Sequence, residues 1–256
     1  MENQMNYGNW IRKKLLLLLG LCTLGMFALI FIPLGFLYRI LMTCGFIFTA
    51  VCFLFPLYSY FMFSQNGGRY QEKVYQLIIQ SIGNPVTGSV LDIGAGNGLL
   101  AIKLAQINPK VQVTGIDYWG KDWEYSKSAC EGNAVIGQVE SRVHFQKADA
   151  AKLEFDNATF DVVVSNLTFH EVRSVKDKRE VVQEALRVVK PAGRFVFVDY
   201  FYDSKRYGNS SHFESFLKSI KLSQFEYKPI KELIALPFLL RHPRIFGKVG
   251  IIYGKK

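Results

Sequence analysis

Residues Ser89 to Ala105 read SVLDIGAGNGLLAIKLA, and this stretch decides the fold of the chain. A short apolar run ends at Ile93, glycines follow at positions 94, 96 and 98, and a helix-like pattern begins at Leu99. A buried strand, a tight glycine turn and a helix start together let a backbone approach a nucleotide-like ligand closely. The stretch therefore predicts the ligand-binding turn of an α/β sheet.

The spacing and the charge of this turn narrow the class of ligand. The spacing G-x-G-x-G differs from the G-x-G-x-x-G pattern of dinucleotide-binding turns. Asp92 lies inside the motif, where its carboxylate would repel a pyrophosphate but suit a cationic or ammonium-bearing ligand.

Two long uncharged runs precede this region, residues 15–37 and 40–63, with only Tyr38 and Arg39 between them. Each is close to the roughly 20 residues that cross a bilayer as a helix, and Pro33 with Gly35 suits a tight turn. The first run is too long for a signal peptide. A buried helical hairpin of a soluble protein is the other alternative, but no polar residues interrupt either face of the two helices. We expect a transmembrane helical hairpin.

The basic flanks of these runs predict their orientation. Basic residues precede the first run and follow the second: Arg12, Lys13 and Lys14 before the first, and Arg69 and Lys73 after the second. Arg39 alone marks the short connection, so both ends should be cytoplasmic. We therefore expect a cytoplasmic N-terminus over residues 1–14, two transmembrane helices over 15–63 and a globular domain over 64–256, on the cytoplasmic side of the cell membrane.

The net charge of +10 is unevenly distributed. Residues 64–200 hold 16 Lys and Arg and 16 Asp and Glu, whereas residues 201–256 hold 11 against 4. On a tethered domain this basic end suggests a face near anionic lipid headgroups, and an ordinary solvated surface is the alternative. No dense basic run with interleaved aromatic residues is present, so we expect no nucleic-acid partner.

The four cysteines predict neither a disulfide framework nor a metal site. Three lie in the apolar runs and Cys130 stands alone, without C-x-x-C or Cys/His spacing.

Strand and helix patterns alternate after the boundary at Gly67-Gly68. We expect strands over residues 90–93, 111–116, 143–146, 160–165 and 194–199, and helices over residues 70–81, 99–106, 123–138 and 175–189. Apolar strands between helices indicate a parallel sheet covered on both faces, with all strand C-termini at one edge, where ligands bind.

Polar residues close successive strands at this expected edge: Asp92, Asp117, Asp149, Asn166 and Asp199. Any single one is equally explained as a helix N-cap. The complete set is hard to explain by capping alone and indicates a ligand site.

Five segments within residues 88–200 resemble the motifs of class I S-adenosylmethionine-dependent methyltransferases: VLDIGAGNG, GIDYW, ADA, FDVVVSN and LRVVKPAGRFVFVD. The chain is particularly similar to small-molecule methyltransferases of the quinone-biosynthesis type, although Ala192 replaces one glycine of the usual Lys-Pro-Gly-Gly turn. The resemblance implies a Rossmann-like, seven-stranded, mostly parallel sheet with helices on both faces. It places the last two strands near residues 225–230 and 248–253.

The resemblance implies S-adenosyl-L-methionine as the cofactor, with its methionine end against the glycine turn. Asp92 would lie near the ammonium group, and the backbone carbonyl of Asn166 would help to hold the amino-acid end. The backbone that lines this portion would be that of Gly94, Ala95, Gly96, Asn97 and Gly98.

The nucleoside end would lie against the next two strands. Asp117 would accept hydrogen bonds from both ribose hydroxyls, and Tyr118 or Trp119 would pack on the adenine. Asp149 would bind the adenine amino group, with the Ala150 amide beside it. Carboxylates suit hydroxyl and amine donors on chemical grounds as well.

Methyl transfer is an in-line displacement that depends mainly on alignment and the exclusion of water. If the acceptor is a hydroxyl or phenol, His170 is our candidate base and Glu171 the second candidate. A structural histidine is the alternative for His170. The acceptor would be a small or lipophilic molecule, such as a quinone or a phospholipid headgroup.

The C-terminal 56 residues, 201–256, are less informative. A helix is expected over residues 210–222. The apolar segment 233–240, flanked by Lys231, Arg241 and Arg244, suits a lid over the acceptor pocket, an interfacial membrane element or burial under the sheet.

Two other functions compete with a membrane-anchored methyltransferase. An NAD-dependent oxidoreductase shares the glycine turn and the acid after the second strand, but not the glycine spacing or Asp92. A non-catalytic, membrane-tethered cofactor-binding protein would keep the same site without turnover.

Overall fold

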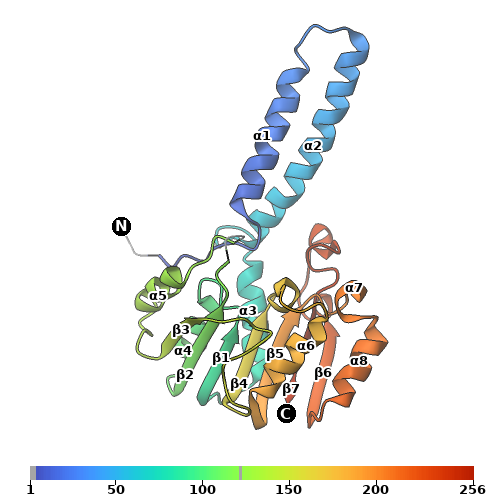
Figure 1. Ribbon diagram of the computed structural model, residues 1–256. Helices are drawn as coiled ribbons and strands as arrows, with labels where there is room; N and C mark the ends of the chain where they lie inside the picture. The colour runs from blue at the N-terminus through green and yellow to red at the C-terminus, as the bar shows by residue number, and fades with distance from the viewer. Residues whose placement is uncertain (1–3, 121–122) are drawn as a thin grey trace. The chain divides into compact units, whose positions relative to one another are not determined.

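The computed structural model describes residues 4–120 and 123–256 (Figure 1). Residues 1–3 of the expected N-terminal segment lie outside the described residues. The chain divides into two compact units, one formed by residues 9–72 and the other by the N-terminal segment up to Gly8 together with residues 73–256. Each unit is described by itself.

The unit of residues 9–72 contains two long helices, α1 (Lys13–Leu29) and α2 (Phe36–Phe63), which lie side by side (Figure 1). Glycines allow their close packing: a Cβ atom added at Gly45 would lie 2.2 Å from Met26 Cε, and one at Gly20 would lie 3.3 Å from Phe53. Small residues at such contacts are typical of helices that associate in membranes.

Only one helix of the described chain, α2, is both long and apolar enough to cross a membrane, with a mean hydropathy of 2.3. Helix α1 has 17 residues. The turn expected at Pro33 and Gly35 is confirmed, but Arg39, which was expected in the connection, lies in the first turn of α2, which begins at Phe36. The connection instead covers residues 30–35, where Gly35 adopts a positive φ of 96°.

A seven-stranded sheet forms the centre of the second unit, in the order β3-β2-β1-β4-β5-β7-β6. Its strands are β1 (Gly88–Ile93), β2 (Val111–Asp117), β3 (Val143–Lys147), β4 (Phe160–Asn166), β5 (Val189–Asp199), β6 (Gln224–Pro229) and β7 (Gly250–Lys255). Strand β7 is antiparallel to both its neighbours, and the other pairings are parallel. The predicted Rossmann-like, mostly parallel sheet is confirmed.

The helices of this unit are α3 (Tyr70–Ile82), which begins in the first unit, α4 (Leu99–Ile107), α5 (Lys127–Ile136), α6 (Lys178–Arg187), α7 (Ser204–Tyr207) and α8 (Ser210–Ser219). Three helices are shorter than expected. Helix α5 begins at Lys127 rather than residue 123, because the Ser126 hydroxyl caps it by accepting from Ala129 N. Helix α6 begins after Asp177 for the same reason and ends at Arg187, and α8 ends at Ser219.

One face of the sheet packs against α6 and α8. Leu91 and Phe197 of the strands, Val182 of α6 and Phe213 of α8 belong to one core cluster and are fully buried. The alternate residue Val90 of β1 is equally buried on the opposite face. Both faces are therefore covered, which explains why the strands read as continuous apolar runs.

Strand β1 pairs with β2 on one side and β4 on the other, so the strand order reverses at β1. The carboxyl ends of these three strands lie next to one another at one edge. This reversal point is where ligands bind in open α/β sheets, so the edge is the first place to look for a site.

Candidate active site

The glycine turn after β1 is closely packed on both sides. Gly94, Gly96 and Gly98 all adopt positive φ angles, of 80°, 57° and 82°. A Cβ atom at Gly94 would lie 1.8 Å from Thr168 Oγ1, and one at Gly98 would lie 2.6 Å from Phe145 Cζ. Only glycine meets both demands at these two positions, so the turn keeps its backbone within reach of a ligand.

Asp92 is buried beneath this turn, with 1% of its surface exposed. Its Oδ2 atom has no hydrogen-bond partner in the described structure. Burial, with a smaller contribution from the charge of Asp117, raises the pKa of Asp92 to about 7 against the opposing N–H of Ala101. A buried acceptor without a donor is costly, and it fits a ligand that brings an ammonium group.

Asp117, at the end of β2, fastens the glycine turn. Its Oδ2 accepts from Gly96 N at 2.9 Å and its Oδ1 from Trp119 N at 2.8 Å. The Trp119 indole donates to Gly96 O at 2.9 Å, which closes the ring of contacts. A carboxylate has about four acceptor positions, so capacity remains for a hydroxyl of a ligand. The ribose contact stays a prediction.

The other residues predicted for the nucleoside end differ in their surroundings. Tyr118 is 64% exposed, with Lys147 Nζ 4.8 Å from its ring centre, whereas Trp119 is held at the glycine turn. Asp149 caps its own turn by accepting from Ala151 N at 2.9 Å, and Ala150 is buried. Tyr118 thus offers an exposed ring and Trp119 a ring fixed at the glycine turn, and packing of either on the adenine stays a prediction.

Asn166 ends β4 beside the end of β1. The neighbouring Ser165 hydroxyl donates to Ile93 O at 2.9 Å, which ties the two strand ends together. The Asn166 carbonyl accepts from Thr168 Oγ1 at 3.1 Å, and its buried Oδ1 has no partner in the described structure. Asp92 and Asn166 thus leave two buried acceptors at adjacent strand ends, and both fit a ligand rich in donors.

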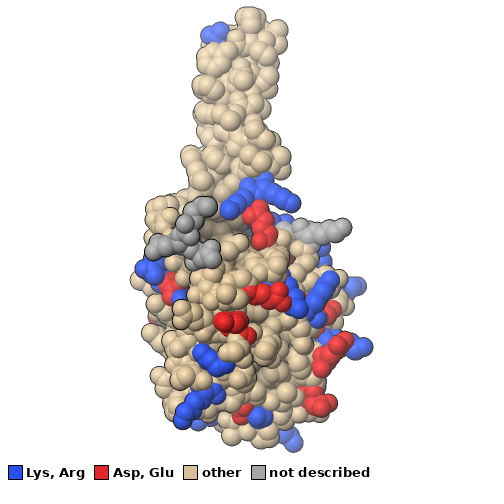
Figure 2. Space-filling view, turned by 90° about the vertical axis from the view of Figure 1, so that its left-hand side faces the viewer, with Lys and Arg blue, Asp and Glu red and all other residues tan. Residues whose placement is uncertain are grey.

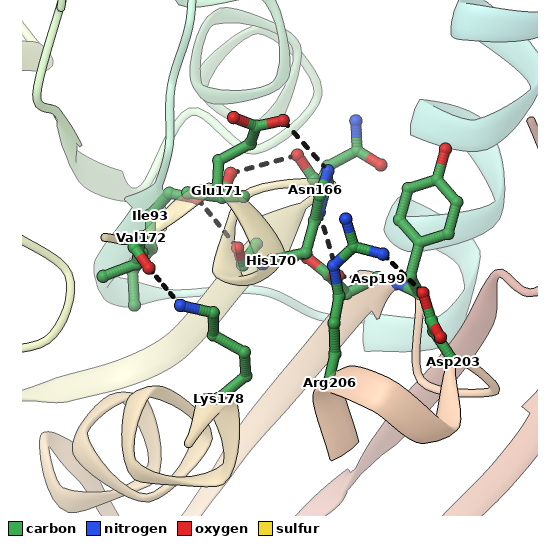
Figure 3. A network of polar contacts seen from close by, with 12 residues as sticks. Ile93, Asn166, His170, Glu171, Val172, Lys178, Asp199, Asp203 and Arg206 are labelled. Carbon is green, nitrogen blue, oxygen red and sulfur yellow. Dashed lines mark hydrogen bonds and ion pairs between the residues drawn. The ribbon is translucent and has the colours of Figure 1, made fainter. Parts of the chain in front are cut away.

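His170 lies on the short helix η1 (Phe169–Glu171) and contacts the end of β5 (Figure 3). Its Nδ1 lies 3.0 Å from Asp199 Oδ1 and 3.1 Å from Oδ2, and its Nε2 lies 3.5 Å from Glu171 Oε1. The Asp199 side chain is fully buried, so the carboxylate fixes the orientation of the ring. Lys178 of α6 donates to the carbonyls of Val172 and Val175 and braces the segment after η1.

The charge of this pair follows from its surroundings. Burial alone would lower the pKa of His170, but the charges and hydrogen bonds of Asp199 and Glu171 outweigh it and raise the pKa to about 9. His170 is therefore an imidazolium at neutral pH. It accepts a proton from a substrate only after it has lost its own.

Tyr200 continues this cluster towards the C-terminal part of the chain. Its ring contacts that of His170 edge-on, with 4.7 Å between centroids, and the Arg206 guanidinium lies 5.6 Å from it. Arg206 pairs with Asp203. The Tyr200 ring therefore packs against His170, and a cationic group lies near that ring.

A set of hydrogen bonds that the sequence did not predict holds the other end of the glycine turn. Asn133 of α5 accepts from Asn6 N at 2.7 Å, and its Nδ2 donates at 2.9 Å to both Asn6 O and Asn97 O. Asn97 Nδ2 also donates to Asn6 O at 3.1 Å. The N-terminal segment, residues 4–8, thus lies against the turn. Gly8 packs on the Tyr125 ring, which itself stacks on Trp123 at 5.6 Å.

No group of three or more His, Cys, Asp or Glu side chains able to hold a metal ion occurs among residues 4–120 and 123–256.

Residues 91–197 match the protein family described as "Methyltransferase domain". The 27-O-demethylrifamycin SV methyltransferase of Amycolatopsis mediterranei is 38% identical over 111 residues, which are 43% of this chain and 38% of that protein. A ubiquinone/menaquinone biosynthesis C-methyltransferase of Desulfotalea psychrophila is 31% identical over 149 residues, 54% of this chain and 56% of that protein. The chain thus spans about half the length of the curated relatives it matches.

A solved structure shares the fold. Phosphoethanolamine N-methyltransferase 2 of Haemonchus contortus, in complex with phosphomonomethylethanolamine and S-adenosylhomocysteine, has a TM-score of 0.54 at 18% identity, over 72% of this chain and 53% of that one. The comparisons confirm the prediction of a methyltransferase domain that depends on S-adenosylmethionine. The same comparisons argue against the alternative of an NAD-dependent oxidoreductase.

Proposed function

We propose that the chain is a membrane-anchored methyltransferase that transfers the methyl group of S-adenosylmethionine to a small or lipophilic acceptor at the cytoplasmic face. One observation carries the proposal: the tightly packed glycine turn covers a buried carboxylate whose Oδ2 lacks a partner. A sulfonium cofactor with an ammonium group supplies the positive charge and the donors that this site fits.

Different residues of the chain would bind different parts of S-adenosylmethionine. Asp92 and Asn166 would take donors from the amino-acid end, because each presents a buried acceptor. Asp117 would take the ribose hydroxyls, and Trp119 would pack on the base. The bound cofactor supplies an electrophilic methyl group, and the protein aligns the acceptor with it and excludes water.

His170 would act on the acceptor's proton, with Asp199 as a positioning residue. The Asp199 carboxylate holds Nδ1, so that Nε2, now beside Glu171, is the atom that would face a substrate. Because His170 is protonated at neutral pH, it would serve as a base only for the fraction that has lost its proton. Glu171 lies next to Nε2 and is the second candidate.

A lipophilic acceptor is favoured by two features. The helical pair α1 and α2 has an uncharged surface between its basic ends (Figure 2), as two membrane spans would have. Several matched relatives are described as quinone-biosynthesis methyltransferases, among them demethylmenaquinone methyltransferase of Leptospira interrogans, 33% identical over 125 residues. Demethylmenaquinone is therefore the first acceptor to try.

Calorimetric titration of the full chain in detergent with S-adenosylmethionine tests the cofactor site. We expect binding to the wild type and a loss of at least about tenfold in affinity for Asp117→Asn, because hydrogen bonds to a charged acceptor are lost. Glu140→Gln, an exposed change outside the site, should bind like the wild type. Binding of NADH in place of S-adenosylmethionine would refute the proposal.

Turnover separates an enzyme from a non-catalytic binding protein. The full chain in vesicles containing demethylmenaquinone, or a lipid extract, should release S-adenosylhomocysteine, and His170→Gln should reduce this release while retaining cofactor affinity. Cofactor binding without release in either preparation would favour the non-catalytic protein.

A further inference from the structure

The connection between β6 and β7, residues 230–249, lies at the same edge of the sheet as the candidate site. Strand β7 is antiparallel to both β5 and β6, so β6 runs in the direction of β5 and ends at the same edge. In Figure 1 this β6–β7 loop, in dark red, extends beyond that end of the sheet.

The loop exposes large apolar side chains at its tip. Phe238 is 85% exposed, Leu239 43% and Leu233 39%. Burial under the sheet, one of the expectations from the sequence, is therefore wrong for these three residues. An aromatic ring left this open to water has an apolar surface that a partner would cover.

Buried residues and hydrogen bonds within the loop keep the side chains at its tip exposed. Leu236, Leu240 and Phe246 are buried and hold the segment on the domain. Arg241 Nε donates to Leu236 O at 2.9 Å, and Phe246 N donates to Leu240 O at 3.0 Å. These contacts close the loop on both sides of Phe238 and Leu239, so the tip is held outward.

The basic residues of the loop indicate which kind of partner would cover its apolar tip. The loop contains Glu232 as its sole acidic residue against four basic ones, of which Lys231, Arg241 and Arg244 are exposed. An apolar tip flanked by basic residues matches the boundary of a bilayer, where the tip meets acyl chains and the cations meet anionic headgroups.

The loop is also connected to the catalytic candidate. The Tyr200 hydroxyl donates to Arg244 O at 2.9 Å, and the Tyr200 ring contacts His170. A lipid surface held by the loop would therefore lie beside the cluster of His170.

We propose that the β6–β7 loop is an interfacial membrane-binding element, with Phe238 and Leu239 inserted at the headgroup boundary, and that the methyl acceptor reaches His170 from this lipid surface. The second half rests on the proposed function. The first half stands on the exposed tip and its flanking charges.

Fluorescence of a site-specific label tests the insertion in the full chain reconstituted into vesicles. Cys22, Cys44 and Cys52 are first replaced by alanine, and an environment-sensitive nitrobenzoxadiazole label is placed at Phe238→Cys. Ser219→Cys is the matched control, because it is exposed at the end of α8, near the start of β6 and the opposite edge of the sheet. Vesicles of phosphatidylcholine with phosphatidylglycerol carry nitroxide groups at shallow acyl positions.

We expect a blue-shifted emission and several-fold stronger nitroxide quenching at position 238 than at position 219. The double change Lys231→Gln and Arg244→Gln should reduce this quenching in phosphatidylglycerol vesicles more than in pure phosphatidylcholine. Equal quenching at both positions, or a blue shift without quenching, would overturn the proposal. The readout involves no methyl transfer, so it stays informative if the proposed activity fails.

Discussion

At the scale of single residues, Asp92 couples cofactor binding to pH. Its pKa of about 7 means that the carboxylate is mostly protonated near pH 6 and mostly ionised near pH 8. An ammonium-bearing ligand prefers the ionised form, so affinity for S-adenosylmethionine should rise about tenfold from about pH 6 to about pH 8. Titration calorimetry of the full chain at both pH values measures this ratio.

Asp92→Asn is the control for this pH effect. It should bind more weakly at about pH 8 and show a ratio near one between the two pH values, because the amide does not titrate. An unchanged tenfold ratio in this variant would assign the effect to another group.

The protonation of His170 should make the stability of the fold depend on pH. Its pKa of about 9 lies above the ordinary value of 6.5, so its pairing with Asp199 stabilises the fold fully below about pH 6.5. That contribution, about 3 kcal/mol, should be lost as the pH rises through 9. Thermal unfolding of the full chain should show a steeper fall in melting temperature over this range than His170→Gln shows.

His212→Gln, at an exposed position of α8, is the matched control and should follow the wild type. Parallel curves for the wild type and His170→Gln would mean that His170 is not held as an imidazolium.

Some of the site residues were predictable from the sequence and others were not. Asp92, the glycines and Asn166 were identifiable because each directly follows or interrupts an apolar strand. Asp199 was equally well explained as a cap, since its partner His170 lies 29 residues away and no local pattern reports that distance. Asn133 gave no signal, because its partner is the backbone of Asn6, 127 residues away.

At the scale of elements, the N-terminal segment and α5 hold the glycine turn together through Asn133. Asn133→Ala would remove the hydrogen bonds to Asn6 N and to the buried Asn97 O, while Asn6 O keeps the bond from Asn97 Nδ2, at a cost of about 1–3 kcal/mol. We expect a lower melting temperature and weaker binding of S-adenosylmethionine, measured on the full chain by thermal unfolding and calorimetry.

Asn6→Ala is a close control, because the hydrogen bonds to Asn133 and Asn97 use only the backbone of residue 6. It should retain nearly the wild-type affinity. If both variants lose affinity equally, the side chain of Asn6 rather than the fastening by Asn133 matters.

Element boundaries were predicted less well than element types, as the start of α5 shows. Helix α5 was expected from residue 123, but its first four positions hold Trp123 and Tyr125, which stack on each other beside the turn instead of entering the helix. The Ser126 cap then starts the helix. Tertiary contacts of two aromatic rings thus override the helical pattern of the sequence.

At the scale of the whole molecule, the number of membrane spans decides where the N-terminus lies. If α1 and α2 both span, residues 4 and 219 lie on the cytoplasmic side and the connection at residues 30–35 lies outside. The basic residues before α1 and after α2 favour this arrangement. If only α2 spans, residue 4 shares the side of the connection.

Labelling with a membrane-impermeant maleimide separates the two arrangements. In the background lacking Cys22, Cys44 and Cys52, single cysteines replace Gln4, Leu34 and Ser219, which are all exposed. In intact cells we expect only Leu34→Cys to be labelled, and Gln4→Cys and Ser219→Cys to react after permeabilisation. Labelling of Gln4→Cys together with Leu34→Cys in intact cells would establish a single span. The basic residues at positions 12–14 would then lie outside, against the charge pattern from which the hairpin was inferred.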